Sequence, residues 1–411
     1  MKEVRGVGDA DGDGNDDIAV GAYKADGAAT GSGEAYLFYG NVTGNKASSS
    51  ADVRFAGAAD GDGFGIAISG GFDWDDDGAP DVAVGAYTRT KTYDETGSVY
   101  LFDGPFAATE NASSAYATWT GTRDYQNLGV RIEGGDFDGD GTDDIVFADQ
   151  YDYAYLYAGP MASGTRSMTA YTACFSYAEA PRLAVADADG DGVDDLAMGN
   201  PDNSAIRDYA GEVAVNYAPY SGTVSFSSSA DATFNGLDED EYYGSNLALG
   251  DLDGDGYVDL AAGAPGNDDG GSAAGAGYVH VGPFVGDVDC TDALVELTGT
   301  HAADGLGSAS AVGDFDGDGQ DDLLLGASAN DDGGTSAGAA YILYGPATAA
   351  WDLSSTATFV GEDAADAAGS RVANAGDVDR DGNTDLLISA PYDDDAASDA
   401  GAAYLFLGGG T

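Results

Sequence analysis

The sequence has little positive charge: 14 Lys and Arg stand against 73 Asp and Glu in 411 residues, for a formal net charge of −59 at pH 7. A surface of this sign repels the phosphates of nucleic acids and anionic membrane surfaces. No apolar run reaches the ~18 residues of a membrane-spanning helix, and the first eight residues, MKEVRGVG, lack the apolar core of a signal peptide. Cations or cationic partners are therefore the better candidates for binding.

Cysteine and histidine are also scarce. Cys174 and Cys290 are too far apart in the sequence for a disulfide framework or a zinc cluster, and we expect buried free thiols, with a bridge left open. His280 and His301 have no Ser or Cys motif beside them, whereas nucleophilic catalysis needs converging groups. We therefore predict that the protein is not an enzyme.

Aspartate and glycine, by contrast, are abundant and periodic. The pattern Asp-x-Asp-x-Asp-Gly-x-x-Asp occurs seven times, and successive copies are 64, 63, 51, 64, 63 and 63 residues apart. A fixed period of this kind indicates a repeat architecture. The first residues of the seven copies are Asp9, Asp73, Asp136, Asp187, Asp251, Asp314 and Asp377.

Each copy is followed by short apolar runs, such as DLAAGAP (259–265) and GAGYVHVG (275–282), then by a weaker strand and a Gly-led run into the next copy. Four short strands per unit, with 65 glycines in the chain, argue against helices and for an all-β fold. Seven such units predict a seven-bladed β-propeller of four-stranded antiparallel blades, forming a single domain over residues 1–411. The 51-residue step places a very short turn between two strands of the third unit (144–159).

Two short motifs make this repeat similar to a known one. Phe64-Gly65 opens a strand, and Gly263-Ala264-Pro265 closes one after an acidic loop. The repeat resembles the FG-GAP repeat of the seven-bladed propeller at the head of integrin α subunits and of many bacterial surface proteins. The resemblance covers essentially the whole chain. Unit four departs from it, with YAEAPRLAVAD (177–187) in place of the Phe-Gly pair.

The spacing of the acidic residues predicts a calcium loop in every blade. Carboxylates at positions one, three, five and nine, with a backbone carbonyl at position seven, form an oxygen cage for a hard cation, and Gly at position six permits the bend. An EF-hand has Glu at position twelve, whereas these loops do not, so each loop is expected to lie in a β-hairpin. About seven Ca²⁺ are expected. The predicted ligands are Asp9, Asp11, Asp13, Asn15 and Asp17; Asp73, Asp75, Asp77, Ala79 and Asp81; Asp136, Asp138, Asp140, Thr142 and Asp144; Asp187, Asp189, Asp191, Val193 and Asp195; Asp251, Asp253, Asp255, Tyr257 and Asp259; Asp314, Asp316, Asp318, Gln320 and Asp322; and Asp377, Asp379, Asp381, Asn383 and Asp385.

Calcium loops of modest affinity fill outside the cell rather than in the cytosol, so we expect an extracellular or cell-surface protein, with this chain as an excised part of a longer secreted one. Seven loops but only six outer-strand segments are present. The last blade is therefore expected either to have three strands with an open edge or to be completed by a longer chain.

The resemblance implies that a protein or glycan ligand binds the face opposite the calcium loops. The loops expected there are residues 24–34, 88–96, 238–243, 267–271, 330–334 and 393–399, which are acidic themselves. Tyr125, Tyr242 and Tyr243 are expected to pack in the core. The predicted function is a non-enzymatic adhesion or interaction module. Two alternatives stay open: an accessory domain of a polysaccharide- or lipid-degrading enzyme, and a structural spacer in a surface layer or filament.

Overall fold

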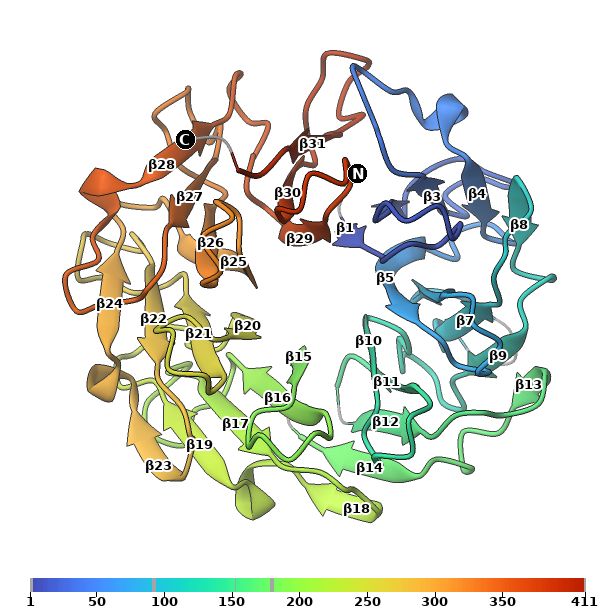
Figure 1. Ribbon diagram of the computed structural model, residues 1–411, viewed down its shortest axis with the longest axis horizontal. Helices are drawn as coiled ribbons and strands as arrows, with labels where there is room; N and C mark the ends of the chain where they lie inside the picture. Colours follow the sequence, from blue (N-terminus) through green and yellow to red (C-terminus); the bar gives the residue numbers. More distant parts are fainter. Residues whose placement is uncertain (1–2, 91–93, 152, 178–180, 410–411) are drawn as a thin grey trace.

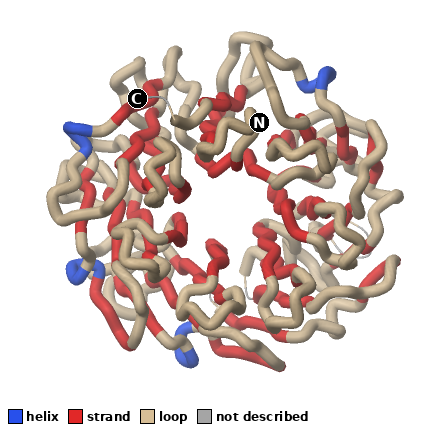
Figure 2. The backbone as a smooth tube through the Cα atoms, in the orientation of Figure 1, coloured by secondary structure: helices blue, strands red, loops and turns tan. Residues whose placement is uncertain are grey.

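The computed structural model describes residues 3–90, 94–151, 153–177 and 181–409. Its strands form seven sheets, which surround a common centre like the blades of a propeller (Figure 1). The strands are joined by long loops, and the described helices are four short 3₁₀ turns at the periphery (Figure 2). The prediction of an all-β, seven-bladed propeller is confirmed. None of the described helices is long and apolar enough to cross a membrane.

Each blade begins with a strand at the centre and continues outward by antiparallel pairing. The first strands are β1 (Glu3–Gly6), β5 (Phe64–Phe72), β10 (Arg131–Gly135), β15 (Arg182–Ala186), β20 (Asn246–Gly250), β25 (Leu306–Gly313) and β29 (Val372–Gly376). The second strands are β2 (Ile18–Ala22), β6 (Asp81–Ala86), β11 (Asp144–Ala148), β16 (Asp195–Asn200), β21 (Asp259–Ala264), β26 (Asp322–Ala327) and β30 (Asp385–Ala390). The third strands are β3 (Glu34–Phe38), β7 (Ser98–Phe102), β12 (Tyr153–Tyr157), β17 (Glu212–Asn216), β22 (Ala276–His280), β27 (Ala339–Leu343) and β31 (Ala402–Phe406).

Six of the seven sheets continue with a fourth strand, and the described part of the seventh has three strands. This agrees with the six outer-strand segments in the sequence. The fourth strands are β4 (Val53–Ala56), β9 (Ala117–Thr120), β14 (Ala173–Ser176), β19 (Ala232–Asn235), β24 (Val295–Thr298) and β28 (Ala357–Val360). The 3₁₀ turns are η1 (Ser48–Ser50), η2 (Ser227–Ser229), η3 (Cys290–Asp292) and η4 (Leu353–Ser355).

Four sheets also have a fifth strand, which the sequence did not predict. It belongs to the next unit along the chain and pairs in parallel with the fourth strand of the preceding blade. These strands are short and largely exposed, so they have no apolar periodicity to reveal them. They are β8 (Thr109–Asn111), β13 (Gly164–Arg166), β18 (Gly222–Ser225) and β23 (Gly286–Asp289).

The core is divided into seven apolar clusters, one between each pair of neighbouring blades. Trp74 and Trp119 of blade two, for example, are fully buried and pack with Phe147 and Tyr157 of blade three. Burial of large aromatic side chains at every interface stabilises the ring without covalent links. Cys174 and Cys290 are buried free thiols, as expected.

The two glycines of the FG-GAP motif allow neighbouring blades to touch through their backbones. A Cβ added to Gly263 on β21 would lie 2.0 Å from the carbonyl oxygen of Gly307, the motif glycine of the next blade. Gly21 stands in the same relation to Gly65, at 2.2 Å, and Gly65 has a φ of +87°. No side chain fits at these contacts, and a positive φ disfavours other residues at the second glycine. The motif is therefore a packing device between blades.

Unit four keeps its place in the ring despite its altered motif. Of the segment 177–187, residues 178–180 lie outside the described part of the chain, and β15 forms at residues 182–186. In unit three, β11 ends at Ala148 and β12 begins at Tyr153, so the 51-residue step shortens a loop, as predicted.

Candidate metal sites

Each acidic segment forms the turn between the first and second strands of its blade; we call these turns metal loops one to seven, in chain order. Glycine at position six has a φ of 86° to 93° in all seven loops, a conformation that other residues rarely adopt. Position four is also left-handed, with φ between 58° and 79°. It is Gly in five loops but Asp76 in loop two and Arg380 in loop seven. The two left-handed residues produce the tight coil of the loop.

The carboxylates at positions one and five hold this coil together. The Oδ2 atom of position one accepts the N–H of position six at 2.8–3.0 Å in every loop. The Oδ1 atom of position five accepts the N–H of position seven at 2.9 Å in every loop. Position two is a buried apolar residue in all seven copies, which anchors the loop to the core. The repeated geometry shows that the loops share one structure.

The aspartate at position nine links the loop to the rest of its blade, and it is at most 1% exposed in all seven copies. In loop six, Asp322 Oδ2 accepts the N–H of Phe315, and its Oδ1 accepts the N–H of Gly345, which follows the third strand. The bond to the second residue after the third strand recurs in every blade at 2.7–3.1 Å. The position-nine side chain therefore connects the conformation of the metal loop to that of the outer strands.

The predicted carboxylate ligands converge. In loops one to four, oxygen atoms of three aspartates lie within 4.8 Å of one another. Burial, reinforced by the neighbouring aspartates, raises the pKa of the position-nine carboxyl to about 7 in Asp17, Asp81 and Asp144. Buried like charges this close are unfavourable unless a cation or a proton neutralises them. The clusters in loops one to four consist of aspartate carboxylates alone, the hard oxygen donors that Ca²⁺ prefers.

Asp103 is a candidate ligand that the sequence pattern missed. It follows the third strand of blade two, and one of its oxygens lies within 4.8 Å of oxygens of Asp75 and Asp77. The Oδ1 atoms of Asp75 and Asp103 are buried and accept no hydrogen bond from any described residue. Buried polar atoms without partners are rare and need an explanation, and a bound cation at loop two would supply one.

A second missed feature connects the metal loops to one another. Four loops have Asp at position eight, and this side chain accepts the N–H of position one of the loop in the preceding blade. The pairs are Asp16 with Asp377, Asp143 with Asp73, Asp194 with Asp136 and Asp321 with Asp251, at 2.8–2.9 Å. Because position one is itself a predicted ligand, a cation bound in one loop would be coupled to the next loop. The sequence signal for this contact was the pair of adjacent Asp residues at positions eight and nine, in NDD, TDD, VDD and QDD.

The opposite face contains a buried polar network where a ligand surface was expected. Glu241 is 1% exposed, accepts the hydroxyl of Tyr278 at 2.6 Å and lies 3.4 Å from Asn267 Nδ2. Asp304 and Asn330 repeat the arrangement in the next unit, at 3.1 Å. These loop bases are therefore structural. The exposed acids lie further out, at Asp238, Glu239 and Asp240, and at the Asp pairs 268–269 and 331–332.

Two of the three tyrosines expected in the core are outside it. Tyr243 is fully buried, but Tyr125 is 55% exposed, and the half-buried Tyr242 packs against the exposed Tyr209, with ring centroids 5.6 Å apart. Both misplaced residues have a φ of 56°. The left-handed turn directs them away from the core, and in each loop a later residue, Leu128 or Tyr243, takes the buried position. His280 is buried and bonded to Tyr243 at 2.9 Å.

These features define a seven-bladed β-propeller with an acidic loop between the first two strands of each blade. Residues 243–281, 306–343 and 368–406 match the FG-GAP repeat, and residues 136–198 match an FG-GAP-like repeat. The resemblance expected from the sequence is confirmed: the chain contains FG-GAP repeats and forms a propeller similar to the N-terminal propeller of integrin α subunits.

Similar curated proteins are integrin α chains. Integrin alpha pat-2 of Caenorhabditis briggsae is 30% identical over 240 residues, 53% of this chain and 19% of that protein. Human integrin alpha-IIb is 30% identical over 198 residues, 46% of this chain and 17% of that protein. The chain thus spans less than a fifth of the length of these relatives. A crystal structure of BBS1N in complex with ARL6DN, soaked with lead, shares the fold, with a TM-score of 0.53 and 10% identity over 97% of this chain and 90% of that one.

Proposed function

We propose that this protein is an extracellular calcium-binding β-propeller that acts as a non-enzymatic adhesion or interaction module. The observation that carries the proposal is the sevenfold repetition of one carboxylate cage, with the same hydrogen bonds in each copy. Seven Ca²⁺ would bring fourteen positive charges to the twenty-eight carboxylates at positions one, three, five and nine. Binding energy would then be coupled to folding, because the empty loops repel themselves.

In each site, the carboxylates at positions one, three, five and nine and the carbonyl at position seven would hold the ion. The cation would neutralise the buried position-nine carboxylate, which in turn is bonded to the backbone beyond the third strand. The ions would therefore stiffen one face of the ring and leave the other face for recognition. Similarity to integrin α chains supports a protein or glycan ligand there, and the exposed acidic loops favour a cationic or calcium-bridged one.

Calorimetric titration of the chelated protein with Ca²⁺, beside thermal melts with and without EGTA, tests the metal proposal. We expect about seven ions and a large fall in melting temperature on chelation. A melting temperature that does not respond to EGTA would contradict it.

The ligand face is tested separately, with glycan arrays and pull-downs from surface extracts in the presence of calcium. We expect binding to weaken when Asp238, Glu239 and Asp240 are replaced by Ser, because these exposed acids lie on the proposed face. The matched control replaces Asp52 with Ser near the metal loops, and it should bind normally. Turnover of a polysaccharide or lipid panel would overturn the non-enzymatic assignment.

A further inference from the structure

Basic side chains gather at the centre of the ring, although the chain as a whole is strongly acidic. Of the 14 Lys and Arg residues, four lie on or next to the first strands, which surround the centre (Figure 1). Among the described residues, the first strands themselves contain two acidic side chains, Glu3 on β1 and Glu133 on β10. The four basic residues are Arg5 on β1, Arg131 on β10, Arg182 on β15 and Arg371 just before β29.

Three of these arginines lie at one level of the ring. Arg131, Arg182 and Arg371 are each opposite the fifth residue of the second strand in their blades. At the same level, blade five has the neutral Asn246 and blade six has the small Ala309. Because every first strand runs toward its metal loop, its beginning lies at the end of the centre away from the metal loops. The three arginines therefore belong to the face opposite those loops.

The charged side chains of this region extend across the centre. Arg5 of blade one donates to Glu133 of blade three, past blade two. Burial, together with the charges of Arg131 and Arg371, lowers the pKa of Arg182. Charges act this way only over short distances, while blades four and seven lie on opposite sides of the ring (Figure 1). The guanidinium groups of the three arginines therefore converge near the centre.

The acidic residues pair with only part of this positive charge. Glu133 and Glu3 both pair with Arg5, and Glu3 also pairs with Arg371 at 3.5 Å. The half-buried Arg131 forms no ion pair with any described residue. Its Nη1 donates to the carbonyl of the preceding residue at 2.6 Å, which uses one of several N–H donors. A cation removed from water without a counterion is unfavourable, and a bound anion would supply the missing partner.

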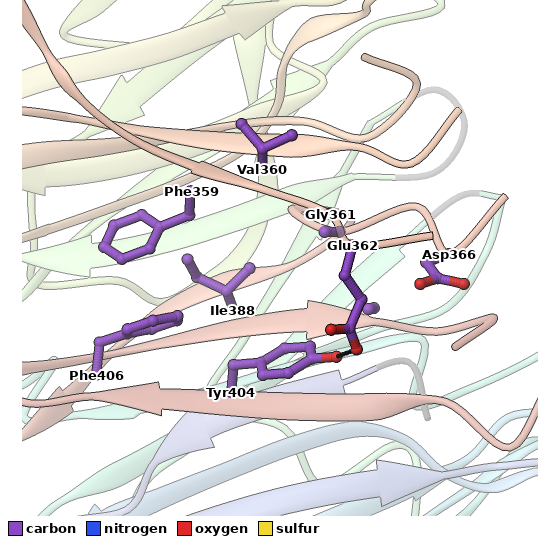
Figure 3. Close-up of a pocket in the computed structure, with 10 residues that line it drawn as sticks. Phe359, Val360, Gly361, Glu362, Asp366, Ile388, Tyr404 and Phe406 are labelled. Carbon is purple, nitrogen blue, oxygen red and sulfur yellow. Dashed lines mark hydrogen bonds between the residues drawn. The ribbon is translucent and has the colours of Figure 1, made fainter. Parts of the chain in front are cut away.

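The surroundings restrict which anion fits. A pocket of about 120 Å³ between blades six and seven has Phe359 and Phe406 on one side and an acidic end at Glu362 and Asp366 (Figure 3). The exposed loops of the same face are acidic as well, for example at residues 238–240. Every further negative charge on a ligand is repelled by such a molecule. A carboxylate has a single charge and forms two parallel hydrogen bonds with a guanidinium group.

We propose that Arg131, Arg182 and Arg371 form an anion site at the centre of the ring, which takes one carboxylate group of a ligand. The proposal rests on the ligand face proposed above and specifies the chemistry recognised there. A protein ligand with one acidic side chain among basic ones matches both the arginines and the acidic loops around them. The carboxylate accepts hydrogen bonds from the guanidinium groups and supplies the counterion that Arg131 lacks.

Trifluoroacetate is a direct probe, because it is a singly charged carboxylate whose fluorine NMR signal broadens on binding. The full chain is titrated in saturating calcium at constant ionic strength. We expect a dissociation constant on the order of 1 mM, competition by acetate, and weaker competition by the doubly charged methyl phosphate. Stronger competition by methyl phosphate than by acetate would overturn the assignment to a carboxylate.

Arg131→Gln distinguishes a binding role from a structural one. We expect it to weaken trifluoroacetate binding at least roughly tenfold. Without the probe its melting temperature should equal or exceed that of the wild type, because an unpaired half-buried charge is removed. The matched control, Arg207→Gln, removes the same charge from an exposed loop of the same face and should bind normally. Equal binding by wild type and Arg131→Gln, or a lower melting temperature of this variant, would overturn the proposal.

Two peptides identify the source of the carboxylate. The labelled peptide KGGEGGK and its counterpart KGGQGGK are compared by fluorescence anisotropy with the wild type and with Arg131→Gln. Tighter binding of the Glu peptide, lost in Arg131→Gln, supports an acidic side chain of a protein ligand. Equal binding of both peptides would overturn that source and give the site to a small organic acid.

The failure of this proposal differs from the failure of the proposed ligand face. If the surface extracts contain no ligand but trifluoroacetate binding still depends on Arg131, the anion site stands and the ligand face does not. If a ligand from the extracts binds the wild type and Arg131→Gln equally well, the ligand face stands and the anion site is overturned.

Discussion

Asp103 adds a charge that no other blade has at the position after its third strand, where the other residues are Tyr39, Ala158, Tyr217, Val281, Tyr344 and Leu407. The pKa of Asp103 is raised by burial and by Asp75, Asp77 and Asp73. A single residue can therefore make one copy of a repeated site different from the rest.

Asp103→Asn should have opposite effects in the two states of loop two. In EGTA we expect a gain of about 1 kcal/mol in the free energy of unfolding, because a like-charge contact is removed. In calcium we expect one site to lose roughly tenfold in affinity, because a charged ligand is lost. Chemical denaturation and calorimetry measure the two effects.

The control for this experiment is Asp332→Asn, an exposed residue in a loop of the opposite face, which should change neither quantity. If Asp103→Asn leaves both the stability in EGTA and the calcium affinity unchanged, Asp103 does not belong to the site.

His280 makes a separate residue-scale prediction. Burial lowers its pKa to about 4, while the unfolded chain binds the same proton near pH 6.5. Below pH 6.5 the unfolded state therefore binds a proton at His280 that the folded state does not bind. The free energy of unfolding falls until the pH reaches about 4. Relative to His280→Gln, the wild type should lose roughly 2–3 kcal/mol between pH 7 and pH 4.5.

Urea unfolding of both proteins in saturating calcium measures this difference, since carboxylate titrations common to both cancel. Parallel pH profiles of wild type and variant would show that His280 is protonated equally well in the folded chain.

At the scale of the element, the metal loop is a nine-residue coil whose shape depends on two left-handed residues. Asp76 has a φ of 58° at position four, where five loops have glycine. An L-residue in this conformation is strained by about 1 kcal/mol. Asp76→Gly should therefore raise the free energy of unfolding in EGTA by about that amount, measured by chemical denaturation.

Arg380→Gly is the informative comparison, because Arg380 occupies the same position in loop seven with a φ of 62°. Its Nη1 donates to the carbonyl of Asp13 in loop one at 3.2 Å. In Arg380→Gly, the relief of backbone strain is offset by the loss of this contact between blades seven and one. The gain in the free energy of unfolding should therefore be smaller than for Asp76→Gly. A larger gain for Arg380→Gly would contradict this explanation.

At the scale of the whole molecule, ion pairs among the first strands help to close the ring. Glu3 of β1 pairs with Arg371, next to β29, at 3.5 Å and with Arg5 at 3.6 Å. Arg5 also pairs with Glu133 of β10. The chain of charges thus connects blade seven, blade one and blade three, and the metal loops of blades seven and one meet through Asp16 and Asp377.

Glu133→Gln should destabilise this closure. The substitution removes a negative charge that balances Arg5 and the neighbouring Arg131. The pKa of Arg131 is already lowered by burial and by Arg371. Because the Arg5–Glu133 pair is partly exposed, we expect a loss of about 1 kcal/mol in the free energy of unfolding, which diminishes in high salt. Glu239→Gln, on an exposed loop, is the control, and an equal loss in both variants would show that the ion pair is not responsible.

The sequence alone determined the number of blades, the order of strands within each blade and the seven metal loops. The reason is that these features are local. In loop six, for example, Asp314 bonds Gly319 and Asp318 bonds Gln320, so one nine-residue pattern contains most of its own contacts. The alternation and glycine positions of the strands are likewise readable within one unit.

Only the tertiary structure decided what joins the units. The fifth strands, the Asp16 to Asp377 contact, the approach of Asp103 to Asp75 and the pairing of Arg5 with Glu133 all depend on side chains or strands brought together by closure of the ring. The outward turn of Tyr125 belongs to the same group. A repeat pattern specifies each blade, whereas contacts between blades depend on the ring geometry, which no single unit contains.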